Sequence, residues 1–376
     1  MPWQEVCAMS LRKEFVMLAL QPGANRRALC QRYGISAPTG YKWLQRYLSE
    51  GDEGLVERSR RPHHSPHRTD NALEQAALAL HRAYGWGGRK LRRRLRDLGY
   101  LDVPSASTLT AVLHRHGLIA PEQSLKHKPW QRFEHPTPNA LWQMDFKGHF
   151  PTATGRCHAL TVLDDHSRFN LTLRACADEQ TATVQRALRD TFRHYGLPEQ
   201  LLLDNGAPWG SDATHRLTPL TVWLTRLGVD VIHSRPYHPQ TLGKDERFHR
   251  TLNDELIKRH RFTGLAHCQR HFDHYRDVYN LERPHESLHM DVPGQHYQPS
   301  PRAFPETLPD IDYPANDIVR KVQIRGELHF RGRLFRVPKA LHGQPVALRP
   351  GQHANRFDVY FCHLRVADLD LDHPRG

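Results

Sequence analysis

The spacing of apolar residues changes twice along the 376-residue chain, and these changes limit its possible folds. Up to about residue 118, apolar residues recur every three or four positions, as on the buried face of a helix. After Pro136 and Pro138 they form short runs, typical of strands, that alternate with longer helical stretches. Prolines crowd the segment 298–316, and the pattern after it predicts short strands at 322–325, 327–330, 333–337, 346–348 and 357–361, several of them separated by Gly turns. We therefore expect an all-α front, a central α/β core and a small C-terminal β-barrel.

The same changes of pattern set the expected domain boundaries. A chain of this length holds two or three compact units of about 150 residues each. The basic stretch after Glu57, rich in Pro and His, lacks an apolar period and is typical of a linker. The expected segments are a helix-turn-helix domain at 1–56, a basic linker at 57–69, a second helix-turn-helix domain at 70–120, a linker at 121–136, the core at 137–297, a Pro-rich linker at 298–316 and the barrel at 317–376.

Positive charge is concentrated at the front of the chain. Lys and Arg number 53 against 40 Asp and Glu, a formal net charge of +13. Residues 1–130 hold 21 Lys and Arg and 11 Asp and Glu, hence +10 of this excess. This balance indicates a polyanionic partner, above all nucleic acid. The sequence has no apolar run of membrane-spanning length, no secretory signal pattern and no CxxC motif, so we expect a protein of the bacterial cytoplasm, associated with the nucleoid, with free thiols.

Two helical stretches flank a tight turn within residues 10–48. The turn is Gly34-Ile35-Ser36, and Ser36 followed by Pro38 is a typical start of a helix. This arrangement predicts a helix-turn-helix, whose second helix reads the major groove of DNA with its first turns. An ordinary helical hairpin with solvated charges is the alternative. The candidate DNA contacts are Ser36, Thr39, Tyr41, Lys42 and Arg46.

A second helix-turn-helix is expected between residues 72 and 116. A Gly-rich turn at 85–88 separates two helical stretches, and Ser105 begins a further helix. Seven basic residues lie between Arg82 and Arg96. They indicate a DNA-binding face, although a solvated helix face is the alternative. The candidate DNA contacts here are Arg89, Lys90 and Arg93.

Three acidic residues stand where an α/β sheet would gather them at one edge. Asp145 lies in the apolar strand 142–147, Asp204 follows the strand 201–203, and Glu246 lies on the helix after a loop. Carboxylates at this edge suit Mg²⁺ or Mn²⁺, and two such ions can activate an attacking oxygen and stabilise the leaving oxygen of a phosphodiester. The intervals of 58 and 41 residues between the acids are weak evidence by themselves, because acidic residues are frequent in this chain.

Five segments around these acids carry a more specific signal. They are Trp142–Lys147, Leu160–Arg168, Asp204–Trp209, His233–Leu252 and Tyr279–His285. In sequence, order and separation they closely resemble bacterial insertion-sequence transposases with a retroviral-integrase-type catalytic core. The resemblance runs from the first helix-turn-helix to about residue 300. It implies an RNase H-like core in which Asp145, Asp204 and Glu246 are the catalytic and metal-binding residues, with two Mg²⁺ or Mn²⁺ ions.

Some residues near the third acid leave alternatives open. Asp245 directly precedes Glu246, at a position that is more often apolar in the family, so chemistry alone does not decide between them. The family motif, counted from Pro239, selects Glu246, and on a helix Asp245 would point about 100° away.

Asp164 and Asp165 either support the metal site or only form a turn. The candidate contacts to the DNA backbone are Arg235, Tyr237, Gln240, Lys244 and Arg247, with solvated charge as the alternative, and Arg283-Pro284-His285 is either a structural cap or a DNA contact.

The resemblance implies a DNA transposase, a polynucleotidyl transferase of the integrase type. Water would attack the phosphodiester at each element end, and the freed 3′ hydroxyl would then attack target DNA. The helix-turn-helix domains would bind the terminal inverted repeats, and a homo-oligomer would hold two ends and the target together. The alternatives are a domesticated, catalytically inactive DNA-binding regulator and an RNase H-like nuclease without joining activity.

Overall fold

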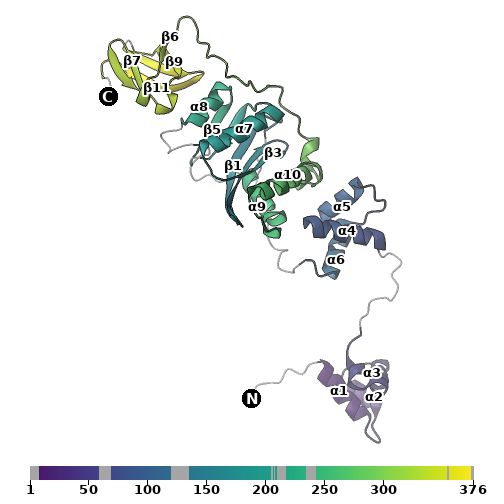
Figure 1. Ribbon diagram of the computed structural model, residues 1–376. Coiled ribbons are helices and arrows are strands. Elements are labelled where there is room, and N and C mark those ends of the chain that lie inside the picture. The colour runs from purple at the N-terminus through teal and green to yellow at the C-terminus, as the bar shows by residue number, and fades with distance from the viewer. Residues whose placement is uncertain are drawn as a thin grey trace. The chain divides into compact units, whose positions relative to one another are not determined.

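The structure is a computed structural model that describes residues 8–58, 69–119, 135–204, 206, 208–209, 217–233, 243–353 and 355–373 (Figure 1). The chain forms two compact units, Met1–Arg68 and Thr69–Gly376. Among the described residues no helix is both long enough and apolar enough to cross a membrane.

The first unit packs three helices around a small apolar core. They are α1 (Ala8–Ala19), α2 (Arg26–Arg32) and α3 (Ala37–Glu50), followed by the short helix η1 (Gly51–Leu55). As expected, Ser36 begins α3, because its Oγ accepts a hydrogen bond from the backbone N of Thr39 at 3.4 Å. Gly40 lets α3 approach α2 closely, since a Cβ there would collide with Sγ of Cys30. The predicted helix-turn-helix is confirmed.

The second unit begins with three more helices. They are α4 (Asn71–Tyr84), α5 (Gly88–Asp97) and α6 (Ala106–Arg115). The side chains of Asp70 and Ser105 accept hydrogen bonds from backbone N–H groups at the starts of α4 and α6. Trp86, from the Gly-rich turn, is 1% exposed and packs with buried leucines of all three helices. These helices bear out the second helical domain that the sequence predicts.

A five-stranded sheet forms the centre of the second unit. Its strands are β1 (Leu141–Thr152), β2 (Gly155–Asp164), β3 (Asn170–Cys176), β4 (Gln200–Leu203) and β5 (Asp230–His233), in the spatial order β3-β2-β1-β4-β5. The pairs β1–β2 and β2–β3 are antiparallel, whereas β4 runs parallel to both β1 and β5. A tight turn at residues 165–167 joins β2 to β3.

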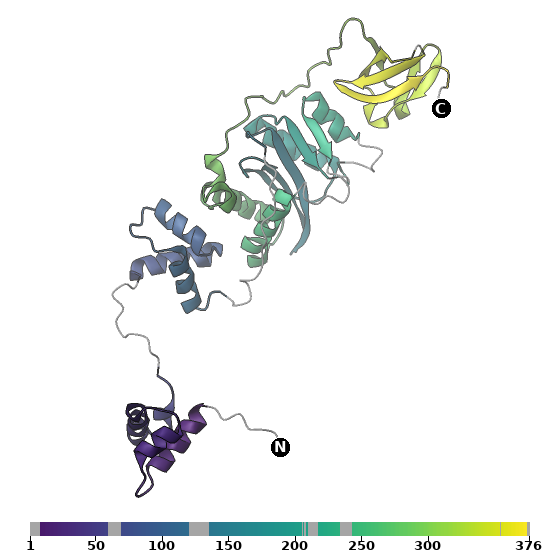
Figure 2. The same ribbon diagram turned by 180° about the vertical axis from the view of Figure 1, so that it is seen from behind.

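Helices cover both faces of this sheet (Figures 1 and 2). On one face, α7 (Thr181–Tyr195) and α8 (Pro219–Arg226) pack on Trp142 and Met144 of β1. On the other face, α9 (Gly243–Glu255) and α10 (Leu265–Leu281) pack on β1, β2 and β3. Successive side chains of a strand point to opposite faces. Asp145, next to Met144, therefore lies on the face that α9 covers.

The C-terminal region is all-β, but the expected closed barrel is not confirmed. The strands β6 (Ile318–Lys321), β9 (Pro345–Pro350), β10 (Arg356–Phe361) and β11 (Leu364–Asp370) form an open sheet in the order β11-β10-β9-β6. The strands β7 (Glu327–Phe330) and β8 (Arg333–Arg336) pair separately and share the same apolar core. The strand predicted at 322–325 is wrong, because Arg325 has a φ of 62°, which no strand residue adopts. Short helices lie at η4 (Ile257–Arg259), η5 (Glu286–Leu288), η6 (Pro293–Gln295), η7 (Ile324–Gly326) and η8 (Lys339–Leu341).

Candidate active site

Strand pairing places Asp145 and Asp204 side by side. The parallel register of β1 and β4 pairs Trp142 with Leu201 and Gln143 with Leu202. When this register is continued by two residues along both segments, Asp145 lies opposite Asp204. Burial is the main cause that raises the pKa of Asp145 to about 7, and the charge of Asp204 is the second. Burial also raises the pKa of Asp204, against a hydrogen bond from the backbone N of Gly206 to its Oδ1 at 3.0 Å.

Helix α9 turns its two neighbouring acids in different directions. Asp245 is 0% exposed, whereas Glu246 is exposed. Burial raises the pKa of Asp245 well above its usual range, and the charge of Asp145 adds to this shift. Glu246 is close enough for its charge to contribute to the raised pKa of Asp145. The different burial agrees with the expected angle of about 100° between successive helical residues.

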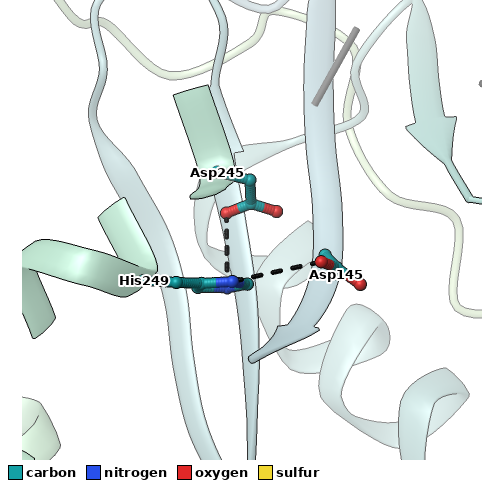
Figure 3. Close-up of side chains that lie close together, drawn as sticks. All are labelled: Asp145, Asp245 and His249. Carbon is teal, nitrogen blue, oxygen red and sulfur yellow. Dashed lines mark ion pairs between the residues drawn. The ribbon is translucent and has the colours of Figure 1, made fainter. Parts of the chain in front are cut away.

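His249 is a site residue that the sequence analysis missed. It lies one helical turn after Asp245, with Nε2 at 3.7 Å from Oδ1 of Asp245 and Nδ1 at 4.0 Å from Oδ2 of Asp145 (Figure 3). Burial, with a smaller contribution from the charge of Lys147, lowers the pKa of His249 to about 3. Its spacing from Asp245 could have indicated His249 in the sequence, because residues four positions apart lie on the same face of a helix.

The donor atoms at this site suit a divalent cation. Asp145, Asp245 and His249 offer one ligand atom each within 4.8 Å of one another, and Asp204 lies beside Asp145. Oδ2 of Asp245 is buried and has no hydrogen-bond partner among the described residues. Gathered, partly buried carboxylates repel one another, and a bound cation offsets that repulsion. Oxygen-rich sites of this kind are typical of Mg²⁺ and Mn²⁺.

Asp164 and Asp165 hold the surrounding loops. Asp164 accepts hydrogen bonds from the backbone N of Asn139 at 2.7 Å and of Ser167 at 2.8 Å, which is a turn-forming role. Asp165 accepts one from Nε2 of Gln143 at 2.8 Å and forms an ion pair with Lys244 at 2.5 Å. Asp165 therefore fixes the start of α9 through Lys244.

The other predicted contacts near α9 have different surroundings. Arg247 is exposed on α9, whereas Arg235, Tyr237 and Gln240 lie outside the described residues. Arg283 is buried and donates hydrogen bonds to Glu255 at the end of α9, two of them at 2.9 Å, so it holds the helix structurally. His285, 8% exposed, lies beside it.

The predicted contacts on α3 lie mainly at the surface. Tyr41 and Lys42 are exposed, and the guanidinium of Arg46 lies 5.1 Å from the ring centre of Trp43. The hydroxyl groups of Ser36 and Thr39 are 2.8 Å apart at the start of the helix.

The predicted contacts on α5 lie against carboxylates of the core. The ion pairs join Lys90 to Glu255 at 3.7 Å, Arg93 to Asp291 at 2.7 Å, Arg94 to Glu282 at 2.5 Å and Arg89 to Glu286 at 3.8 Å. These four basic residues of α5 thus meet negative charge within this chain.

Family models match several parts of the chain. An integrase core domain matches residues 135–239, and a second integrase core model matches residues 227–293. The centre of the chain is an integrase core. The C-terminal domain of the IS481 family of transposases matches residues 317–375, and helix-turn-helix and homeodomain-like models match residues 11–63 and 39–113. The resemblance to insertion-sequence transposases with an integrase-type core is confirmed.

Two curated proteins that are similar to this chain come from insertion elements. The chain is 27% identical over 226 residues to the insertion element IS476 uncharacterized 39.2 kDa protein of Xanthomonas euvesicatoria, covering 57% of this chain and 60% of that protein. It is 28% identical over 158 residues to the insertion element IS407 uncharacterized 31.7 kDa protein of Burkholderia multivorans, covering 42% of this chain and 55% of that protein. The chain therefore matches less than two thirds of the length of these relatives.

Solved structures with some similarity are retroviral. A chain of the simian T-cell lymphotropic virus intasome, in complex with a PP2A regulatory subunit, aligns with a TM-score of 0.39 at 15% identity, over 75% of this chain and 91% of that one. The HTLV-2 integrase catalytic core domain in complex with magnesium aligns with a TM-score of 0.34 at 15% identity, over 43% of this chain and 99% of that one.

Proposed function

We propose that this chain is a DDE transposase that binds the terminal inverted repeats of an insertion sequence, cleaves the DNA at the 3′ ends and joins those ends to target DNA. The observation that carries the proposal is the proximity of three acids: Asp145 within β1, Asp204 directly after the neighbouring β4, and Glu246 of α9, whose charge also acts on the pKa of Asp145. This arrangement belongs to an integrase core in a basic chain with helix-turn-helix domains.

Asp145, Asp204 and Glu246 would hold two Mg²⁺ or Mn²⁺ ions. The bound ions would supply charge neutralisation at the phosphodiester and a more acidic attacking oxygen. Asp145 and Asp204 come from paired strands, so their separation is fixed by the sheet. Glu246 comes from a helix and is exposed, so it can complete the site when DNA arrives. Arg247, which is exposed on α9, would hold the DNA backbone beside these acids, and Lys244 would do so on release from its ion pair with Asp165.

The reaction needs two DNA ends and a target, so we propose that the protein works as a homo-oligomer on double-stranded DNA, in the cytoplasm and nucleoid of a bacterium. Water would attack the phosphodiester at each element end, and the 3′ hydroxyl group released there would attack a target phosphodiester. Neither step requires a covalent protein intermediate.

A joining assay tests the proposal. The full chain is incubated with Mg²⁺ or Mn²⁺, labelled DNA from the inverted repeats that flank the gene, and a target plasmid. We expect labelled joined products from the wild type and none from Glu246→Gln, which should bind the repeat DNA with unchanged affinity. Cleavage without joining would identify a nuclease, and repeat binding without cleavage would identify a DNA-binding regulator. Equal joining by the wild type and Glu246→Gln would overturn the assigned triad.

A further inference from the structure

A single buried hydroxyl group links the acidic strand to the catalytic helix. Thr161 of β2 lies opposite Asp145 in the antiparallel register of β1 and β2 and is 0% exposed. Its Oγ1 lies 3.0 Å from the carbonyl oxygen of Asp145 and 3.1 Å from Oδ1 of Asp245. The same Oγ1 lies 2.8 Å from Nε2 of His249. One side chain therefore contacts β1 and two successive turns of α9.

We propose that Thr161, Asp245 and His249 form a positioning network that sets the rotation of α9 and thereby aims Glu246 at Asp145 and Asp204. The inference rests on the proposed function, because it assigns these three residues a task only if the acidic centre binds metal ions. Sequence comparison with a family motif singles out Glu246 and gives its neighbour no task.

The apolar contacts of α9 cannot fix this rotation alone. Phe248 and Leu252 anchor the helix in a cluster with Phe150 and Leu163. Apolar burial is non-directional, so a small rotation of the helix costs little in such a cluster. Hydrogen bonds have strict directional demands and lose their strength when the angle fails. Asp245 supplies that constraint from the position next to Glu246.

Burial of Asp245 is costly for the fold, which separates this network from ordinary packing. A carboxyl group without full hydrogen bonding destabilises a folded chain, and Oδ2 of Asp245 has no hydrogen-bond partner in the part of the chain that the structure describes. A leucine, which is larger but branches at Cγ as aspartate does, would place methyl groups here and avoid the cost of desolvating a carboxyl group. The buried polar group is thus better explained by the reaction than by stability.

Asp245 and His249 have a competing role as metal ligands, since their atoms lie within 4.8 Å of an Asp145 oxygen. Thr161 separates the two roles. The hydroxyl group of Thr161 contacts Asp145, Asp245 and His249. It can therefore affect metal binding only through these residues.

The first experiment measures Mn²⁺ binding by electron paramagnetic resonance, and repeat cleavage, in the full chain and in Thr161→Val and Thr161→Ser. Valine keeps the shape of threonine and removes the hydroxyl group. We expect Thr161→Val to lower Mn²⁺ affinity about tenfold and the cleavage rate constant about 10–100-fold, with the dissociation constant for repeat DNA changed less than about twofold. Thr161→Ser should recover most of both losses. Wild-type behaviour of Thr161→Val would overturn the network.

Two substitutions of Asp245 complete the test and remain informative if Thr161→Val does not fold. Asp245→Leu should keep or raise the melting temperature while cleavage falls about 10–100-fold; a lower melting temperature with normal cleavage by the folded protein would show a purely structural role. Asp245→Asn keeps an oxygen acceptor for Thr161 and should retain Mn²⁺ binding. Loss of binding equal to that of Glu246→Gln would make Asp245 a ligand instead.

Failure of the proposed function gives a different result. In that case the wild type itself binds no Mn²⁺ and shows no metal-dependent cleavage. Failure of the positioning network alone leaves the wild type active and Thr161→Val indistinguishable from it.

Discussion

Charged side chains are arranged in opposite ways at the acidic centre and on α5. At the acidic centre, Asp145, Asp204 and Asp245 are gathered in partly or fully buried positions, and the pKa of each is raised by burial. On α5, Arg93 and Arg94 each meet a carboxylate of the core. Like charges that gather at a cost to the fold indicate a site for a ligand of opposite charge, whereas paired charges need no ligand. The number of charges in a segment does not distinguish these two arrangements.

The largest expected effect concerns the cost of charge at the acidic centre. In metal-free protein with EDTA, Asp145→Asn should raise the free energy of unfolding by about 2–4 kcal/mol at pH 8 and leave it unchanged at pH 4. The pKa of Asp145 rises from 3.8 to about 7 on folding, so the wild type loses stability as the pH rises between these values. Above about pH 7 the full cost is present, and below pH 4 it is absent.

Urea denaturation at the two pH values measures this difference. Asp277→Asn is the matched control, because it removes an exposed carboxylate from α10. That control should change stability at neither pH. A destabilised Asp145→Asn at pH 8 would mean that the acidic centre is held together by favourable contacts, as α5 is.

The next largest expected effect is on DNA affinity, which we compare between variants of α3 and variants of α5. Lys42 is exposed and Arg46 is half-buried on α3, whereas Arg93 and Arg94 of α5 form ion pairs with carboxylates of the core. We expect Lys42→Ala with Arg46→Ala to weaken binding of repeat DNA about 100-fold and to reduce its salt dependence. Arg93→Ala with Arg94→Ala should weaken binding less than about threefold.

Fluorescence anisotropy at two salt concentrations gives both quantities. Lys13→Ala serves as the control on the first unit, since Lys13 is paired with Asp52 at 2.6 Å. If the α5 double variant lost more affinity than the α3 double variant, the ion pairs with the core would have to open on DNA.

The smallest expected effect concerns stability at the contact of α5 with the core. Arg93→Ala should lower the free energy of unfolding by about 0.5–1 kcal/mol, because its ion pair with Asp291 is partly exposed and therefore screened. The loss should shrink in 1 M salt. Arg96→Ala removes an exposed charge from the same helix and should have no effect on the urea midpoint. An equal loss from both variants would show that α5 itself, and not its contact, is weakened.

Much of the fold could be predicted from residue patterns. Each of the two predictions that failed in the C-terminal region has its own physical cause. Ser36 and Ser105 mark helix starts because capping depends on neighbouring backbone groups alone. The C-terminal strands were mostly found, but the strand at 322–325 fails because the backbone turns at Arg325. Closure of these strands into a barrel could not be predicted, because closure depends on which strands pair.

The candidate site was predictable in its strand residues and less so in its helix. Asp145 and Asp204 follow from two short apolar runs that pair in one sheet. The inward direction of Asp245 and the place of His249 depend on which side of α9 meets the sheet. Similarly, Arg93 and Asp291 are 198 positions apart, so no local pattern links them.

The sequence by itself determined the order of the domains, the starts of the helices and the presence of three acids in an integrase-type pattern. These features depend on local periodicity and on neighbouring residues. Only the tertiary structure decided which charges are paired, which acid of α9 is buried and which side chain joins β1 to α9. Those outcomes depend on contacts between segments far apart in the chain, where burial and distance set the cost of each charge.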